Sequence, residues 1–421
     1  MLSVSETETK QAIVIGAGII GICSTLALQD KGYSVTVIDR AGAAEATSFG
    51  NAGVISPWSC VPQSMPGVWK QVPQWLFDPQ GPLAVRWSYV PKLLPWIIKF
   101  IKAGAEHRLP AIADAMLAVN QPSLDLYHQL LADTGEDDLV KDCSYLHVSR
   151  STNGVDPQGL GWRMREERGV PFETLKPGEA QEIEPELSPQ FKSAIVIKQQ
   201  GRTVNPGRLG KVLAAKAKAQ GANFVRAEVK QIVPQSTGGY QIETDQEPHT
   251  ARTVILTAGA WSNRLLAPLG VHIPLEAERG YHLVYTKPGL TLTHSIMDVD
   301  HKFVTSSMEM GVRSAGTAEF AGLDAPPDYR RAQIFKRLSK ELLPNLNTES
   351  NEHWMGPRPS SPDSVPYIGP VPGHPGLFCG FGHAHLGLTG APMTGRMLAA
   401  LVAQEPLNAN MKPYRLDRFN D

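Results

Sequence analysis

Residues 12–40 read AIVIGAGIIGICSTLALQDKGYSVTVIDR, and this stretch decides the fold. A short apolar run over residues 12–15 ends at the pattern GAGIIG, which begins at Gly16. Helical periodicity continues from there, and a second, β-branched run ends at Asp39. This order of elements is typical of a dinucleotide-binding βαβ unit: a strand, a glycine turn, a helix, a second strand and an acidic residue.

Each glycine of this pattern has a physical task. Gly16 permits the tight turn, Gly18 lets the backbone approach a pyrophosphate, and Gly21 lets the helix pack closely against the strand. The start of the helix supplies N–H donors and a partial positive charge. Asp39 follows Gly21 by 18 residues, close to the spacing expected for an acid that binds a ribose hydroxyl. The pattern predicts a bound dinucleotide but does not choose between FAD and NAD.

Composition excludes several other classes of protein. The 421 residues suggest two to three domains at about 150 residues each, and 42% hydrophobic with 19% charged residues indicates a globular core. The net charge of −1 provides no basic field for nucleic acid. The four scattered cysteines form no C-x-x-C pair, so no metal site is predicted.

The sequence also bears on location. The polar N-terminus does not resemble a secretory signal, and no apolar stretch reaches the 18 residues of a membrane span. We therefore expect a cytoplasmic protein and leave open a peripheral contact with the inner face of the cytoplasmic membrane.

Residues 57–104 have an unusual composition. Prolines recur there, and the segment holds five of the eight tryptophans, namely Trp58, Trp69, Trp75, Trp87 and Trp96. Two interpretations remain open: a hydrophobic lid over a substrate, or a surface that contacts a membrane or a quinone-bearing partner. The prolines interrupt any long amphipathic helix, and the overall charge gives no general attraction to membranes. Both points favour the lid.

A second segment, residues 163–168, is rich in charge. It contains Arg163, Arg165, Glu166, Glu167 and Arg168 within one helical run. Mixed charges at this spacing are typical of a solvated helix face, and we interpret the cluster in that way.

Six separated motifs extend the analysis over nearly the whole chain. They are AIVIGAGIIG (12–21), TSFGNAGVISP (47–57), TVILTAGAWS (253–262), ERGYHL (278–283), GPRPSSPD (356–363) and GFGHAHLGLTGAPMTG (380–395). Together they resemble the FAD-dependent amino-acid oxidoreductases of the D-amino-acid oxidase and glycine oxidase superfamily. Within it, the sequence most resembles the small-subunit type of bacterial D-amino-acid dehydrogenase.

The resemblance implies an α/β fold with two domains. The first is a doubly wound FAD-binding domain, Rossmann-like and of the glutathione-reductase type, built from residues 1–56, 150–270 and 352–421. The second is an α+β substrate domain on an antiparallel sheet, built from residues 57–149 and 271–351.

The resemblance also implies where FAD binds. The expected contacts include the glycine turn, Asp39 at the adenosine ribose, and a helix start at residues 386–389 beneath the flavin pyrimidine ring. Non-covalent FAD is expected, because Gly356 stands where sarcosine oxidases of the superfamily carry a cysteine. The full expected set is Gly16, Gly18, Ile20, Gly21, Asp39, Arg40, Ser48, Asn51, Ala52, Gly53, Val229, Ala258, Gly259, Trp261, Gly382, His383, Leu386, Gly387, Leu388 and Thr389.

The expected catalytic residues follow from amino-acid oxidation, in which a hydride leaves Cα for flavin N5. Arg358 matches the arginine that binds the substrate carboxylate, a role suited to its planar, bidentate fork. Tyr281 or His282 is expected to face the substrate, and His383 to lie beside the flavin. Phe303 stands where relatives place a carboxylate-binding tyrosine, which leaves His301 as a substitute.

Two further residues are candidates for the site. Arg313 is a rival to Arg358, although its place at a strand start favours a structural role. His385 is a second candidate contact in the motif of His383, and the sequence assigns no general base.

The function expected is oxidative deamination of a small D-amino acid or cyclic imino acid, with electrons passed to a quinone or other carrier. One alternative is an oxygen-using oxidase of glycine, N-methyl or L-amino acids. An alternative of another class is a non-catalytic flavoprotein subunit or assembly factor.

Overall fold

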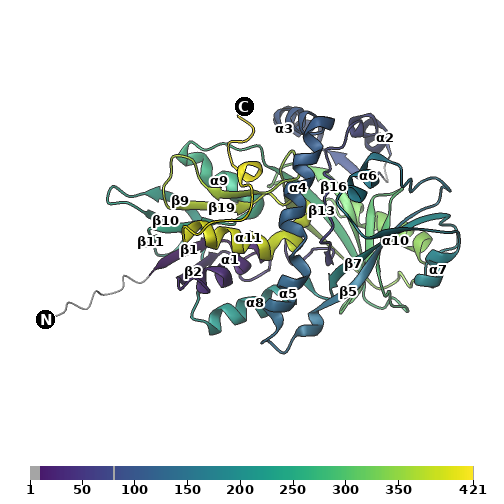
Figure 1. Cartoon of the computed structure of the whole chain (residues 1–421), viewed down its shortest axis with the longest axis horizontal. Coiled ribbons are helices and arrows are strands. Elements are labelled where there is room, and N and C mark those ends of the chain that lie inside the picture. The colour runs from purple at the N-terminus through teal and green to yellow at the C-terminus, as the bar shows by residue number, and fades with distance from the viewer. Residues whose placement is uncertain (1–9, 79–80, 421) are drawn as a thin grey trace.

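The computed structural model describes residues 10–78 and 81–420. Two large sheets organise these residues, one at the left of Figure 1 with the N-terminus and one at the right. The first sheet has six strands, parallel except for β18, in the order β18 (Tyr367–Pro370), β19 (Leu377–Phe381), β12 (Thr253–Leu256), β1 (Gln11–Ile15), β2 (Ser34–Asp39) and β8 (Asn223–Arg226).

Strand β1 shows why this sheet is covered on both faces. Side chains alternate along a strand, and every residue from Ala12 to Ile15 is buried. Ala12 and Val14 pack in the cluster that holds α11, whereas Ile13 and Ile15 pack with β10. The helical layer contains α1 (Ile19–Gln29), α8 (Pro206–Ala219) and α11 (Gly387–Val402). The other layer contains α9 (Ser262–Leu266) and a small antiparallel sheet of β9 (Val229–Pro234), β10 (Tyr240–Thr244) and β11 (His249–Ala251).

The second sheet has ten strands and is mostly antiparallel. Its main path runs β17 (Asn351–Ser360), β13 (Glu276–Tyr285), β16 (Gly311–Phe320), β15 (Phe303–Met308), β14 (Ser295–Asp298), β5 (Val140–Ser149), β7 (Ser193–Thr203) and β3 (Val54–Ile55). Two short strands pair beside it, β4 (Leu83–Val85) with β16 and β6 (Phe172–Leu175) with β7. Helix α10 (Arg330–Leu342) packs on one face, where its Phe335 and Leu338 meet Leu283 of β13. The opposite face is left for the cavity described below.

Further helices connect the two sheets. Figure 1 shows α3 (Val90–Ala103), α4 (Leu109–Asn120) and α5 (Ser123–Leu131) between them, and α4 and α5 pack on α11. Three shorter helices complete the structure: α2 (Val72–Phe77), α6 (Leu160–Glu166) and α7 (Glu179–Ile183). In the described ranges, no helix has the length and apolar character needed to cross a membrane.

The α/β class with an antiparallel second sheet is as the sequence predicted, but four strands lie in the other sheet from the one expected. We assigned β3, β6, β7 and most of β17 to the FAD-binding domain, and all four belong to the ten-stranded sheet. The reason is pairing: β7 bonds to β5, β3 and β6 bond to β7, and β17 bonds to β13. The division into domains remains a proposal, with these four strands on the substrate side.

Candidate active site

A cavity of about 1190 Å³ reaches from the glycine turn after β1 to the free face of the ten-stranded sheet. Residues from both sheets, from α1 and from the segment containing α2 and α3 line it. All five tryptophans of residues 57–104 are among the lining residues. That placement matches the interpretation of this segment as a lid.

The glycine turn has the geometry that close ligand approach requires. Gly16 has φ +107°, and a Cβ there would lie 2.7 Å from the carbonyl oxygen of Thr257. A Cβ at Gly21 would lie 1.9 Å from the carbonyl oxygen of Gly16. Gly18 is the N-cap of α1 and has no side chain of its own, and the Ser48 hydroxyl oxygen accepts a hydrogen bond from the Ile19 N–H (3.0 Å). The start of α1 opens on the cavity, which suits a pyrophosphate.

Asp39 lies at the end of β2 and lines the same cavity. Its Oδ2 accepts a hydrogen bond from the Ala17 N–H (2.8 Å), and its Oδ1 accepts from the N–H groups of Ala41 (2.8 Å) and Gly42 (3.1 Å). These three bonds orient the carboxylate, which has about four acceptor sites and so keeps one for a hydroxyl donor. Beside it, the Arg40 guanidinium lies 4.2 Å from the Trp261 ring centroid. Both arrangements fit the adenosine end of FAD.

The remaining predicted cofactor residues divide into two groups. Those that line the cavity, in addition to Gly16, Gly18, Asp39, Arg40 and Trp261, are Ile20, Ser48, Asn51, Ala52, Val229, Ala258, Gly259, His383, Leu386, Gly387 and Leu388. Gly21, Gly53, Gly382 and Thr389 do not line it, and they shape the backbone instead. A Cβ at Gly53 would meet the Thr203 carbonyl oxygen at 2.7 Å, and Thr389 Oγ1 accepts a hydrogen bond from the Ser56 N–H (3.1 Å).

Arg313 hydrogen-bonds to the backbone of residues 47–57, the segment that we call the cofactor loop. It is 3% exposed, does not line the cavity, and donates through Nη1 to the carbonyl oxygen of Asn51. Asn51 Oδ1 in turn accepts from the Gly53 N–H (2.8 Å). Arg313 thus holds the backbone beside the cavity and does not face the substrate space.

Arg358 of β17 lines the cavity, and residues of β13 hold its guanidinium in place. We call this arrangement the seat of Arg358. Its Nη1 donates to Glu278 Oε1 (2.6 Å) and to the Thr317 carbonyl oxygen (3.2 Å). A Cβ at Gly280 would lie 2.2 Å from Nη2 of Arg358 and 2.3 Å from its Cζ, so the guanidinium rests against this glycine. The seat holds the planar fork in one orientation.

Glu278 is a site residue that sequence reasoning missed. It is 4% exposed, lines the cavity, and accepts from the Ser360 hydroxyl (2.8 Å) as well as from Arg358. Burial acts to raise the pKa of Glu278, but Arg358 and Ser360 outweigh it and hold this pKa below its usual value. The motif ERGYHL contains a signal for Glu278, because Glu278 and Gly280 are two positions apart in the chain and therefore lie on the same face of a strand.

Two histidines of the C-terminal motif line the cavity beside this pair. His383 Nε2 lies 2.8 Å from Thr394 Oγ1, while its buried Nδ1 has no hydrogen-bond partner among the described residues. Burial lowers the pKa of His383 to about 3. Burial also lowers the pKa of His385, against the opposing charge of Glu278. His383 is therefore neutral near pH 7 and offers a hydrogen-bonding nitrogen to a bound molecule.

The sequence predicts that Tyr281 or His282 faces the substrate, and the structure places His282 away from the cavity. Its ring stacks on Trp354 with centroids 5.0 Å apart, and its Nδ1 lies 3.0 Å from the Gly50 carbonyl oxygen. It does not line the cavity, because Trp354 and the Gly50 backbone cover it. Tyr281 does line it, but the Tyr281 hydroxyl donates to Glu319 Oε2 (2.6 Å) and accepts from the Asp328 N–H (2.9 Å). That hydroxyl is thus engaged away from the substrate space.

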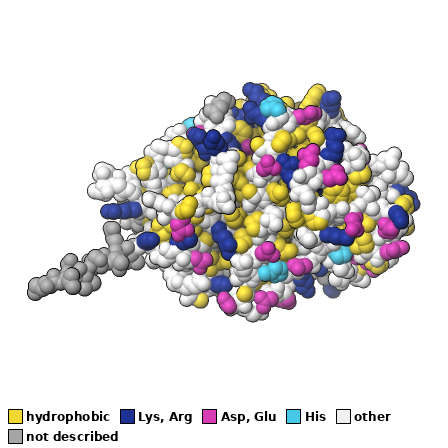
Figure 2. All heavy atoms as spheres, viewed as in Figure 1, with side chains coloured by type: hydrophobic (Ala, Val, Ile, Leu, Met, Phe, Trp, Pro, Cys, Tyr) yellow, Lys and Arg dark blue, Asp and Glu magenta, His cyan; other side chains and the backbone are white. Residues whose placement is uncertain are grey.

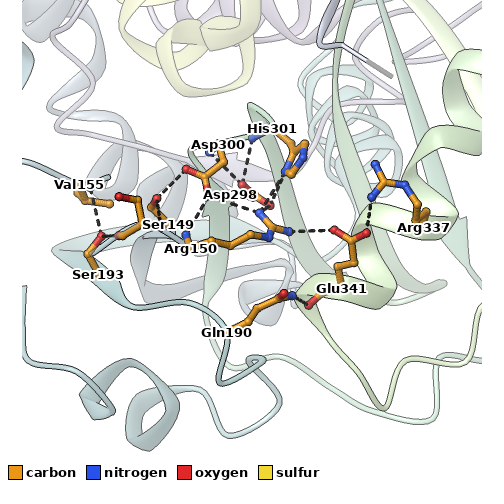
Figure 3. Close-up of polar contacts among 11 residues, drawn as sticks. Ser149, Arg150, Val155, Gln190, Ser193, Asp298, Asp300, His301, Arg337 and Glu341 are labelled. Carbon is orange, nitrogen blue, oxygen red and sulfur yellow. Dashed lines mark hydrogen bonds and ion pairs between the residues drawn. The ribbon is translucent and has the colours of Figure 1, made fainter. Parts of the chain in front are cut away.

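The predicted role of His301 is wrong. His301 lies in the turn between β14 and β15, outside the cavity lining. Figure 3 shows it within an ionic cluster, with Nδ1 at 3.2 Å from Asp298 Oδ2 and at 3.1 Å from Arg150 Nη1. Phe303 points to the other face and packs against Phe335 of α10. Neither residue can therefore contact a substrate carboxylate.

The interpretation of residues 163–168 as a solvated face needs one correction. Arg163, Glu166 and Glu167 are exposed, but Arg165 is only partly exposed and lines the cavity. Its guanidinium stacks on Trp162 at 4.5 Å from the ring centroid. A short helix of mixed charge does not reveal which of its arginines meets a neighbouring sheet.

Residues 11–401 match the family model described as DAO, FAD dependent oxidoreductase. The chain belongs to this family. A D-amino-acid oxidase of Bradyrhizobium diazoefficiens is 36% identical, over 98% of this chain and 99% of the relative. A D-amino acid dehydrogenase of Paramagnetospirillum magneticum is 31% identical, over 97% and 99%.

Solved structures show that the DAO-family fold is shared. Glycine oxidase from Geobacillus kaustophilus superposes with a TM-score of 0.75 at 21% identity, covering 97% of this chain and 99% of that one. L-proline dehydrogenase from P. horikoshii gives a TM-score of 0.74 at 20% identity, covering 98% of each chain. The recognition made from the motifs is confirmed, and the chain is an FAD-dependent oxidoreductase.

Proposed function

We propose that this DAO-family enzyme oxidises the Cα–N bond of a D-amino acid or a cyclic imino acid. The observation that carries the proposal is the seat of Arg358 on Gly280 and Glu278, in the same cavity as the glycine turn. A planar cation held in one orientation suits a carboxylate that must be positioned beside a redox cofactor. Two relatives matched over nearly their full length and named for D-amino acids support the substrate class.

The residues of the cavity have distinct tasks in such a reaction. Arg358 binds the substrate carboxylate, and Glu278 fixes the guanidinium through its bond to Nη1. His383, which is neutral, accepts or donates one hydrogen bond without adding charge. The tryptophan-rich segment excludes water from the reacting carbon. FAD, when bound, supplies the acceptor for the hydride.

Anaerobic reduction of the flavin tests this proposal. The FAD-loaded protein is mixed with matched D- and L-amino acids, glycine, sarcosine and proline enantiomers, and bleaching of the flavin absorbance is followed. We expect D-amino acids or cyclic imino acids to bleach it fastest. Fastest bleaching by L-amino acids or sarcosine would favour the alternative oxidases, and no bleaching by any compound would favour a non-catalytic subunit.

We further propose that the electrons leave to a carrier in an anionic membrane rather than to oxygen. Six of the eight large hydrophobic side chains exposed in the described ranges lie between residues 69 and 101: Trp69, Phe77, Trp87, Leu94, Ile98 and Ile101. Residues 68–102 carry five basic side chains and one acid, a net charge of +4 in a chain of net charge −1. Figure 2 shows basic and hydrophobic side chains side by side along the upper edge, where Figure 1 places α3. Exposed aromatic and apolar side chains beside lysines favour an anionic lipid surface.

Vesicle binding and oxygen uptake test the choice of acceptor. Trp87, 73% exposed, and Phe77, 80% exposed, are changed together to serine, because Trp96 is buried and donates to the Ser360 carbonyl oxygen. We expect the wild type to sediment with anionic vesicles at low salt and the double variant to stay in solution. Tyr329→Ser, an exposed aromatic residue outside the segment, is the matched control. Rapid oxygen uptake without vesicle binding would instead indicate an oxidase.

A further inference from the structure

One end of the cavity carries positive charge that the proposed reaction does not use. It is formed by Arg165 of α6, Lys302 at the start of β15, and His147 of β5. Arg165 donates through Nη1 to the Gly161 carbonyl oxygen (3.1 Å), while its buried Nε has no hydrogen-bond partner among the described residues. In the same ranges no carboxylate forms an ion pair with Arg165. This differs from Arg358, whose charge Glu278 offsets.

The neighbouring groups do not fully neutralise this end. Arg165 stacks on Trp162, whose ring centroid lies 5.3 Å from that of His147, so the guanidinium lies in the neighbourhood of His147. Lys302 lines the cavity as an exposed side chain and forms no ion pair within the described chain, although Asp300 and Asp298 favour its charged form. Asp298 is also bound by Arg150 and His301 (Figure 3).

Burial lowers the pKa of His147 to about 3, with Arg165 and Lys302 acting in the same direction, so the ring is neutral near pH 7. The His147 Nε2 atom is buried and also lacks a partner among the described residues. This end of the cavity therefore presents two cations, neither of them in an ion pair within the described chain, and one unpaired nitrogen.

The pairing register places this end far from Arg358. His147 is level with Met297, Met297 with Val304, Val304 with Ala315, and Ala315 with His282 of β13. That is four strand spacings of about 4.8 Å, or about 19 Å between the backbones of β5 and β13. Arg358 lies against β13, so Arg165 and Arg358 approach a bound molecule from opposite ends.

The floor between the two ends is apolar. Met297, Val304 and Ala315 all line the cavity there. Val304 and Ala315 pack with Val54 and Ala52 of the cofactor loop, so this floor lies beside the expected position of the flavin. The site therefore has a carboxylate seat at one end, an apolar middle, and unpaired cations at the other end.

We propose that Arg165 and Lys302 bind a second carboxylate at the far end of the substrate. The enzyme then prefers amino or imino acids whose side chain or N-substituent is long and ends in a carboxylate. This inference rests on the proposed function and adds the substrate class. The chemical basis is that the Arg165 Nε atom is buried without a hydrogen-bond partner among the described residues, which is costly, and that a planar guanidinium gains most from a bidentate carboxylate.

Binding of unreactive acids to the FAD-loaded enzyme tests the anion site without turnover. Sebacate and decanoate have ten carbons each, long enough for the dicarboxylate to reach both ends, and they differ in the second carboxylate; calorimetry gives both affinities. We expect sebacate to bind at least tenfold more tightly than decanoate. Arg165→Met should abolish that preference, whereas Arg163→Met, on the exposed side of the same helix, should keep it. Equal affinities in the wild type, or a preference that survives Arg165→Met, would overturn the proposal.

Turnover of a matched pair separates this inference from the proposed function. D-2-aminosebacate and D-2-aminodecanoate are compared by kcat/KM, and we expect a ratio above ten that falls to near one in Arg165→Met and recovers in part in Arg165→Lys. If Arg165→Met does not fold, Lys302→Met is measured in its place and should lower the same ratio. Oxidation of both compounds at equal efficiency overturns the second carboxylate site but leaves the proposed function intact. If neither these nor any other D-amino or imino acid reduces the flavin, the proposed function fails, and the sebacate titration still decides the anion site.

Discussion

The seat of Arg358 leads to a sharp prediction for Gly280→Ala. The added Cβ would lie 2.2 Å from Nη2, 2.3 Å from Cζ and 2.6 Å from Nε of Arg358. Carbon and nitrogen atoms in contact lie about 3.5 Å apart, so the guanidinium must move by about 1 Å or more. Because it is the end of a flexible side chain, the fold can absorb that movement.

The effect should therefore appear in substrate handling rather than in stability or cofactor binding. A displacement of about 1 Å at a positioning group costs on the order of 100-fold in kcat/KM. We expect that loss for the best amino-acid substrate, together with unchanged FAD affinity and a midpoint of unfolding close to that of the wild type. The assay is steady-state reduction of a soluble dye, combined with fluorescence titration of FAD.

Two comparisons make the result decisive. Gly161→Ala is the control for a glycine-to-alanine change, because its Cβ would meet its nearest neighbour at an ordinary 3.5 Å. Gly280→Ala combined with Arg358→Met should be no worse than Arg358→Met alone, since both act through one guanidinium. A kcat/KM within threefold of the wild type in Gly280→Ala would refute the seat. A double variant whose loss of kcat/KM equals the product of the two single losses would also refute the seat.

Three further predictions concern the site and its stability. Arg358→Lys should lower kcat/KM by about 100-fold while FAD affinity stays near normal, because a point charge does not replace the planar fork; near-normal turnover would contradict the assignment. Acid or heat should release the flavin into the supernatant, since Gly356 offers no thiol and no cysteine of the described chain lines the cavity; flavin that stays with the denatured chain would show a covalent bond. The pKa values of His282 and His383 are lowered to about 3 in the folded protein, so the unfolded chain takes up more protons below pH 6.5. Stability should therefore fall as the pH drops from 7.5 to 5, by about 2 kcal/mol for each histidine in urea unfolding, and a flat profile would argue against their burial.

Local sequence was sufficient for the nucleotide-binding half of the site. The turn at Gly16 and Gly21 and the acid at Asp39 lie within one βαβ unit, and their geometry depends on neighbours a few residues away. The same holds for the C-terminal motif, where residues 383–388 line the cavity as a continuous segment. Short-range spacing determines backbone conformation, so such motifs can be located from sequence by their pattern.

The substrate half was decided by tertiary structure. Arg358 and Glu278 are 80 residues apart, and only the pairing of β17 with β13 places them together. His282 shares a strand with Glu278 and Gly280, yet Trp354 from the neighbouring strand covers it. Strand alternation specifies which face a side chain takes, but not what the adjacent strand places over it.

The sequence by itself determined that a dinucleotide binds at the N-terminal βαβ unit. It also located the motif at residues 356–363, whose arginine suits a substrate carboxylate. Only the tertiary structure decided which charges face the cavity. Arg165 and Arg163 stand two apart on one short helix with the same chemistry, and packing against the ten-stranded sheet turns one of them inward. His301 is drawn into the Arg150 cluster for a similar reason, because the turn after β14 places it beside Asp298. The free energy of a charge depends on its three-dimensional neighbours, and the order of residues along the chain does not specify them.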